Sequence, residues 1–149
     1  MTRRAAREIA VQLCYASLFT DASPEEAVDD LFDQEYFNTL AQESDFFDQK
    51  PDETQRAYIQ QLVSLVREHR DELDAAISKY AKGWKLERIS RIAASVLRCA
   101  MAEILYLEDI PAAVTINEAV ELAKGYEEPE TVAFINGILG SFVRGDAEA

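Results

Sequence analysis

Histidine, cysteine, proline and glycine are all scarce in this chain of 149 residues, which has one histidine, two cysteines, four prolines and five glycines. The lone His69 and the widely separated Cys14 and Cys99 do not have the spacing of a zinc site. The sequence also lacks a glycine-rich phosphate loop and any run of about 18 apolar residues that could span a membrane. These absences argue against an enzyme, a cofactor site, a metal site and a membrane protein.

The start of the chain does not have the pattern of an export signal. Arg7, Glu8 and Gln12 interrupt the apolar region that a signal peptide requires. We therefore expect a cytoplasmic protein in which both cysteines are reduced and buried. The length is that of one domain with its own hydrophobic core.

Positive charge is also in short supply, because 28 acidic residues outnumber 15 basic ones and the formal net charge is −13. The acids are concentrated: residues 21–55 contain twelve acids and one base. A strongly acidic protein repels nucleic acid at long range. A separate basic patch that faces away from the acidic region can still bind it.

Two basic clusters are candidates for such a patch. The first seven residues contain Arg3, Arg4 and Arg7 and no acid. The second cluster lies near the aromatic residues Tyr80 and Trp84, and its members are Lys79, Lys82, Lys85, Arg88 and Arg91. Basic side chains contact phosphates and aromatic rings stack on bases, so this combination is typical of binding to single-stranded RNA.

Apolar residues recur at helical spacing along nearly the whole chain, which predicts an all-α fold. Residues 86–107 are apolar almost all the way round, as expected of a central helix that is enclosed by others, with Arg88, Arg91 and Arg98 forming a short basic stripe. The other expected helices cover about residues 3–19, a short segment after Ser23, 53–68, 70–82, 113–124 and 132–143. We expect the tail after Gly145 to be frayed.

Four polar or small residues lead to more specific expectations. His69 stands in a charged run and should lie on a solvated helix face. Gly137 lies inside a helical pattern, where glycine costs about 1 kcal/mol of helix propensity. We expect the last two helices to cross closely at Gly137, with the amides of Asn117 and Asn136 either bonding across the crossing or capping neighbouring backbone, so that a larger residue at 137 would destabilise the fold.

Four regions of the sequence resemble one known family. They are RRAAREIAVQLCY at residues 3–15, WKLERI and VLRCAMAEI in the middle, IPAAVTINEAVELAKGY at 110–126, and FINGIL at 134–139. In order and spacing they are similar to the NusB family of transcription antitermination factors over essentially the whole chain. The acidic residues 21–55 contribute least to this similarity.

The resemblance implies about seven helices in two bundles that share the central helix, an amino-terminal bundle at about residues 1–82 and a carboxy-terminal bundle at about 84–145. It also implies binding of boxA-type RNA in nascent transcripts, notably those of ribosomal RNA operons. The implied partners are a ribosomal small-subunit protein, called NusE in this role, and the RNA polymerase antitermination complex. Whether the free protein forms a homodimer stays open.

The basic clusters and the resemblance together give the candidate site residues. Those for RNA are Arg3, Arg4, Arg7, Lys82, Arg88, Arg91, Phe134 and Asn136. Tyr15 falls on a partner-facing position of the family, and Leu18 is the second candidate partner contact. Phe134 either stacks on an RNA base or belongs to the core of its helix.

Two other functions compete with this interpretation. The same helical domain precedes RNA cytosine methyltransferases, so the chain could be the RNA-binding domain of an enzyme. It could also be a helical protein-interaction module without RNA function. Measuring RNA binding with and without the ribosomal partner separates the last alternative from an antitermination factor.

Overall fold

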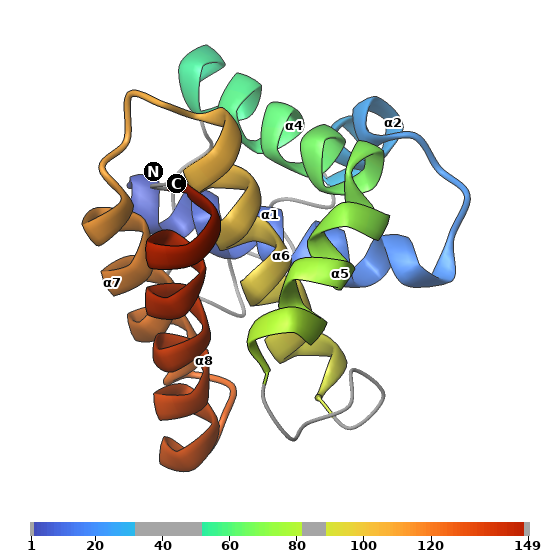
Figure 1. Ribbon diagram of the computed structural model, residues 1–149. Coiled ribbons are helices and arrows are strands. Elements are labelled where there is room, and N and C mark those ends of the chain that lie inside the picture. Colours follow the sequence, from blue (N-terminus) through green and yellow to red (C-terminus); the bar gives the residue numbers. More distant parts are fainter. Residues whose placement is uncertain (1, 32–51, 82–88, 148–149) are drawn as a thin grey trace. The chain divides into compact units, whose positions relative to one another are not determined.

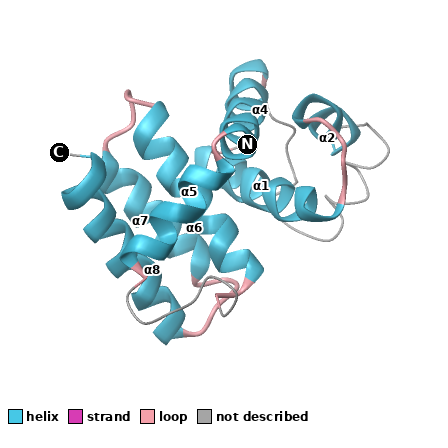
Figure 2. Ribbon diagram, turned by 45° about the vertical axis from the view of Figure 1, so that its right-hand side comes forward, coloured by secondary structure: helices cyan, strands magenta, loops and turns pink. Residues whose placement is uncertain are grey.

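The computed structural model describes residues 2–31, 52–81 and 89–147, and this described part contains helices and no strands (Figures 1 and 2). Seven α-helices are present in it, which confirms the all-α fold class. The chain divides into two compact units, residues 1–64 and 65–149. The expected bundle boundary at residues 82–84 lies outside the described residues. None of the described helices is long and apolar enough to cross a membrane.

Helix α1 (Arg3–Ala16) begins at a capped position and presents an apolar face to the first unit's core. Thr2 precedes it, and the Thr2 hydroxyl oxygen accepts a hydrogen bond from the Ala5 amide at 3.0 Å. Ile9 and Ala10 are completely buried. The helix is shorter than expected, because the last turn tightens into a 3₁₀ helix over Ser17–Phe19.

Helices α2 (Pro24–Leu31) and α4 (Glu53–Glu68) follow, and the last turn of α4 belongs to the second unit. The predicted Ser23 cap is confirmed, since its hydroxyl accepts a hydrogen bond from the Glu26 amide at 3.1 Å. Helix α4 opens with a reciprocal capping box between Asp52 and Gln55. Its buried face carries Tyr58, Ile59 and Leu62.

Helix α6 (Arg91–Tyr106) is the helix around which the second unit packs. It contacts α5 (Arg70–Tyr80), α7 (Ala112–Ala123) and α8 (Pro129–Phe142), as Figure 1 shows. Every residue from Ala93 to Glu103 is buried, as expected of an enclosed helix. It begins at Arg91 rather than near Leu86, because the hydroxyl of Ser90 caps it by accepting a hydrogen bond from the Ala93 amide at 3.1 Å.

Two charged side chains of α6 are buried and paired with neighbouring helices. The expected exposure of Arg98 is wrong: its side chain is 8% exposed, and Nε donates to Asp74 Oδ1 of α5 at 2.6 Å. Glu103 is 1% exposed and accepts a hydrogen bond from the Thr115 hydroxyl of α7 at 3.0 Å. Buried polar groups of this kind are tolerated only when they are hydrogen-bonded, so both pairs fix how α5 and α7 lie against α6.

The end of the chain is ordered further than expected, because a π-helical turn continues α8 over Val143–Ala147. Lys79 of α5 donates to Asp146 of this turn at 2.9 Å. Gly145 packs so closely on Tyr80 that a Cβ atom at this position would collide with the Tyr80 hydroxyl. Up to residue 147 the tail is therefore held against α5, and it is not frayed as expected.

Gly137 does not lie at a close helix crossing, so the expectation for this residue is wrong. It is exposed on α8, and a Cβ atom added there would meet no described atom within 4 Å apart from its chain neighbours and the backbone of its own helix. Asn117 and Asn136 are also exposed, and neither amide is hydrogen-bonded to another group of the described chain. Helix α8 packs instead through Ile135, Leu139 and other residues on its opposite side.

Candidate nucleic-acid interface

The amino-terminal arginines occupy the first turns of α1 and differ in exposure. Arg3 and Arg4 are exposed, whereas Arg7 is 8% exposed. The guanidinium of Arg3 lies over the Tyr58 ring, 4.3 Å from its centroid. Because Arg3 is exposed, its guanidinium remains accessible to a phosphate. The positive surface of this cluster is therefore supplied by Arg3 and Arg4 in the first turn.

Only the first and the last member of the second basic cluster, Lys79 and Arg91, lie among the described residues. Arg91 is exposed at the first position of α6. Lys79 is exposed at the end of α5, and its hydrogen bond to Asp146 raises the pKa of the ammonium group and lowers that of the carboxyl group. Lys82, Lys85 and Arg88 lie outside the described residues, so the continuity of this cluster stays a prediction.

Phe134 and Asn136 lie on different sides of α8. Two residues along an α-helix correspond to a rotation of about 200°. Asn136 is exposed and lines a groove between α7 and α8, whereas Phe134 is half-buried and is not part of that groove. The two candidates therefore cannot contact the same point of a ligand.

The groove between α7 and α8 was not expected from the sequence. Its volume is about 600 Å³, within the usual range of ligand sites. Asn117, Val120 and Lys124 line it from α7, and the remaining lining residues are Glu127, Pro129, Val132, Ala133 and Asn136.

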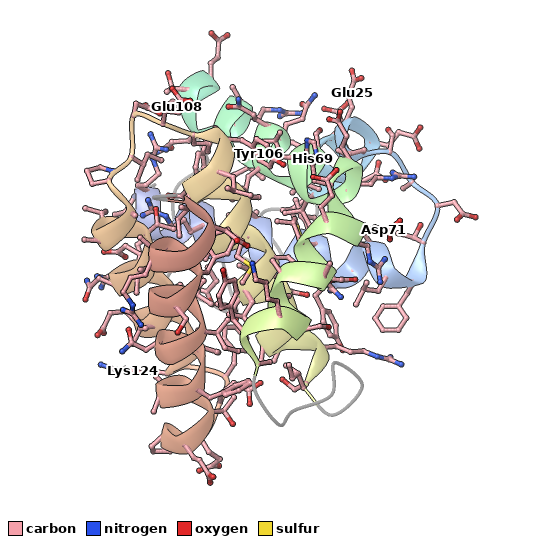
Figure 3. The ribbon with its side chains drawn as sticks, viewed as in Figure 1. Glu25, His69, Asp71, Tyr106, Glu108 and Lys124 are labelled. Atoms are coloured by element: carbon pink, nitrogen blue, oxygen red, sulfur yellow. The ribbon has the colours of Figure 1, made fainter. Side chains whose placement is uncertain are left out.

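Both charged groups on the groove have a partner. Lys124 Nζ is 2.7 Å from Glu121 Oε1, and Glu127 accepts a hydrogen bond from the Ser90 hydroxyl that caps α6. Figure 3 shows the Lys124 side chain projecting from α7. The groove thus has apolar walls and two amides that make no hydrogen bond to any described group of the chain.

The candidate partner contacts lie at the end of α1. Tyr15 is 38% exposed and Leu18 is half-buried. The Tyr15 ring meets the edge of Phe19, whose exposure of 59% is high for a phenylalanine, at a centroid distance of 5.5 Å. Sequence reasoning missed Phe19, although its position four residues after Tyr15 places the two on one helix side. Exposed aromatic pairs are typical of protein interfaces.

His69 is not on a solvated face, in contrast to the expectation. Its ring stacks on Tyr106 with centroids 4.3 Å apart, and the two side chains lie together in Figure 3. Partial burial of the Tyr106 hydroxyl, followed by the charges of Glu72 and Glu68, raises the pKa of Tyr106. This stack joins the start of α5 to the end of α6. Among the described residues, no group of three acidic, cysteine or histidine side chains could hold a metal ion.

Comparison with known proteins places the whole chain in one group. The model of the NusB family matches residues 4–144. The transcription antitermination protein NusB of Acetivibrio thermocellus is 42% identical over 144 residues, which cover 97% of this chain and 90% of that protein. The protein of the same name from Clostridium botulinum strain Kyoto is 34% identical, over 96% of this chain and 100% of that protein.

Solved structures have the same fold. The structure of T. maritima NusB has a TM-score of 0.79 and 28% identity, and the match covers 99% of this chain and 94% of that one. A crystal structure of the antitermination factors NusB and NusE in complex with double-stranded RNA matches with a TM-score of 0.71 and 22% identity, over 95% of this chain and 96% of that one.

Proposed function

Since this chain belongs to the NusB family of transcription antitermination proteins, we propose that it binds boxA-type single-stranded RNA of nascent transcripts, notably in ribosomal RNA operons. It does so together with the ribosomal protein NusE, and the assembly acts on RNA polymerase in the cytoplasm to suppress termination. In this proposal the protein is an adaptor and not an enzyme. The observation that carries it is the pair of exposed arginines at the start of α1 in a chain of net charge −13.

Charge segregation supports an RNA role for this end of α1. The first seven residues contain three arginines and no acid in a chain that has 28 acids overall, so this end of α1 is positive in an otherwise acidic protein. Arg3 and Arg4 stand in the first turn, where the free backbone amides of a helix also favour anions. Together they form an anion-binding helix end, and phosphate is the anion of RNA.

A salt titration of RNA binding tests the proposal. We expect Arg3→Ala and Arg4→Ala each to weaken every RNA to a similar extent and to reduce the slope of log K against log salt by about 0.7 for each lost contact with a single strand. Arg67→Ala is the matched control, because Arg67 is an exposed arginine near the end of α4. An unchanged slope in the double variant would remove the arginines from the site.

The partner half of the proposal rests on the exposed aromatic pair at the end of α1. Aromatic residues often supply much of the binding energy in protein interfaces. Tyr15→Ala and Phe19→Ala should weaken NusE binding by about tenfold or more, and Leu18→Ala by less because Leu18 is half-buried. Normal NusE binding by both aromatic variants would place the partner elsewhere.

A further inference from the structure

The groove between α7 and α8 has the chemistry of a site for a neutral, flat, hydrogen-bonding ligand. Val120, Val132, Ala133 and Pro129 supply apolar walls. The amides of Asn117 and Asn136 each offer a donor and an acceptor that no described group of the chain uses.

Charge on the groove favours an uncharged ligand. The charge of Lys124 is paired with Glu121, and Glu127 keeps its negative charge while it accepts a hydrogen bond from Ser90, so neither group selects a phosphate or a carboxylate. An apolar peptide side chain would fit the walls but would cover both amides without satisfying them, which costs binding energy. A nucleobase satisfies both requirements.

The exposed face of α8 provides a path from the groove toward Phe134. At about 100° per residue, Ala133 and Gly137 lie between Asn136 and Phe134 around the helix. Both are exposed, and the space above Gly137 is open to at least 4 Å. Ala133 and Gly137 thus form a low ridge between Asn136 and Phe134, over which a strand can pass.

We propose that the α7–α8 groove binds one adenine base of the single-stranded RNA between Asn117 and Asn136, and that the strand crosses α8 over Gly137. This inference rests on the proposed RNA-binding function. An asparagine amide matches the N6 donor and the N7 acceptor of adenine, the bidentate pairing by which proteins select this base. The valine and proline side chains pack on the faces of the ring.

A base scan tests the preference for adenine. The full chain, with NusE present in every arm, is titrated with uridine oligonucleotides that carry a single adenosine at successive positions, and with the all-uridine parent. We expect one position to bind roughly 5- to 150-fold more tightly than the parent. If adenosine gives no advantage at any position while RNA still binds, the adenine site is wrong and the RNA proposal stands. If not even boxA-type RNA binds, both fail.

Two amide variants locate the preference. Asn117→Ala and Asn136→Ala should lower binding of the best adenosine oligonucleotide toward that of the all-uridine parent, and should leave the parent's own binding nearly unchanged. Gln61→Ala, which removes an exposed amide from α4, is the matched control and should change neither. The inference is overturned if the adenosine preference survives in both asparagine variants, or if these variants weaken NusE binding in the absence of RNA instead.

Substitutions at Gly137 test the path over α8. Gly137→Leu raises the ridge without a clash inside the protein, so we expect a melting temperature at or above that of the parent and a loss of RNA affinity of about tenfold or more. Gly137→Ala is the control, since one methyl group gains helix propensity and leaves the path nearly as low. A leucine variant that binds the best oligonucleotide as tightly as the parent would refute the crossing.

Discussion

Replacing Asp74 by alanine should lower the free energy of unfolding by more than its half-buried position on α5 suggests. The Arg98 side chain is 8% exposed, and its Nε lies 2.6 Å from Asp74 Oδ1. Asp74→Ala leaves a buried guanidinium without its carboxylate, and breaking such a pair costs about 3–5 kcal/mol. For a chain of this length the loss corresponds to a fall in melting temperature of roughly 6–20 °C.

A control and a rescue variant separate the buried charge from the loss of a surface ion pair. Arg70 also faces Asp74, at 3.8 Å, but it is 47% exposed. Arg70→Ala should therefore cost less than about 1 kcal/mol. The double variant with Asp74→Ala and Arg98→Met should regain most of the stability, because no charge is then left buried. Urea unfolding measures all three, and a loss below about 1 kcal/mol for Asp74→Ala would show that Arg98 is hydrated and the reasoning wrong.

Three further predictions concern α8 and the turn after it. Phe134→Ala should weaken RNA binding by about 1–3 kcal/mol while the protein melts almost normally; a fall in stability of about 3–5 kcal/mol would assign Phe134 to the core. Gly145→Ala should detach the π-helical turn, because a Cβ atom would collide with the Tyr80 hydroxyl, and hydrogen exchange of residues 143–147 should rise. The lowered pKa of Asp146 means that its pair with Lys79 stabilises the fold above the ordinary carboxyl pKa and is lost as the pH falls through the lowered one; an NMR titration should show that Lys79→Met returns the pKa of Asp146 toward its ordinary value.

The helical periodicity of the sequence was enough to predict the fold class and most of the helices. It was wrong at some helix ends, where single side chains decide. The apolar pattern of the central helix extends back to Leu86, yet the helix begins at Arg91 because Ser90 caps it. The helix expected at about residues 53–68 matches α4, whose start at Glu53 is fixed by the capping box between Asp52 and Gln55.

The polar residues were harder to place, since periodicity does not say which exposed-looking residue has a distant partner. Arg98 follows the basic stripe of its helix in the sequence but is buried, because Asp74 lies 24 positions earlier on a neighbouring helix. His69 likewise stacks on Tyr106, 37 positions away. The α7–α8 groove is invisible to sequence reasoning for the same reason: its walls come from two helices, and only their packing brings Asn117 and Asn136 to one site.

Gly137 lowers the stability of helix α8, and the proposed RNA site gives a reason for this loss of stability. Glycine inside an exposed helix gives up about 1 kcal/mol relative to alanine, and packing offers no return here because nothing lies within 4 Å of the missing Cβ. Backbone geometry does not require glycine either, since residue 137 lies within the regular helix α8. A residue that lowers stability without a structural reason is expected where function restricts the sequence. The low ridge between the groove and Phe134 supplies that reason, because an RNA backbone can cross α8 only where no side chain rises into its path.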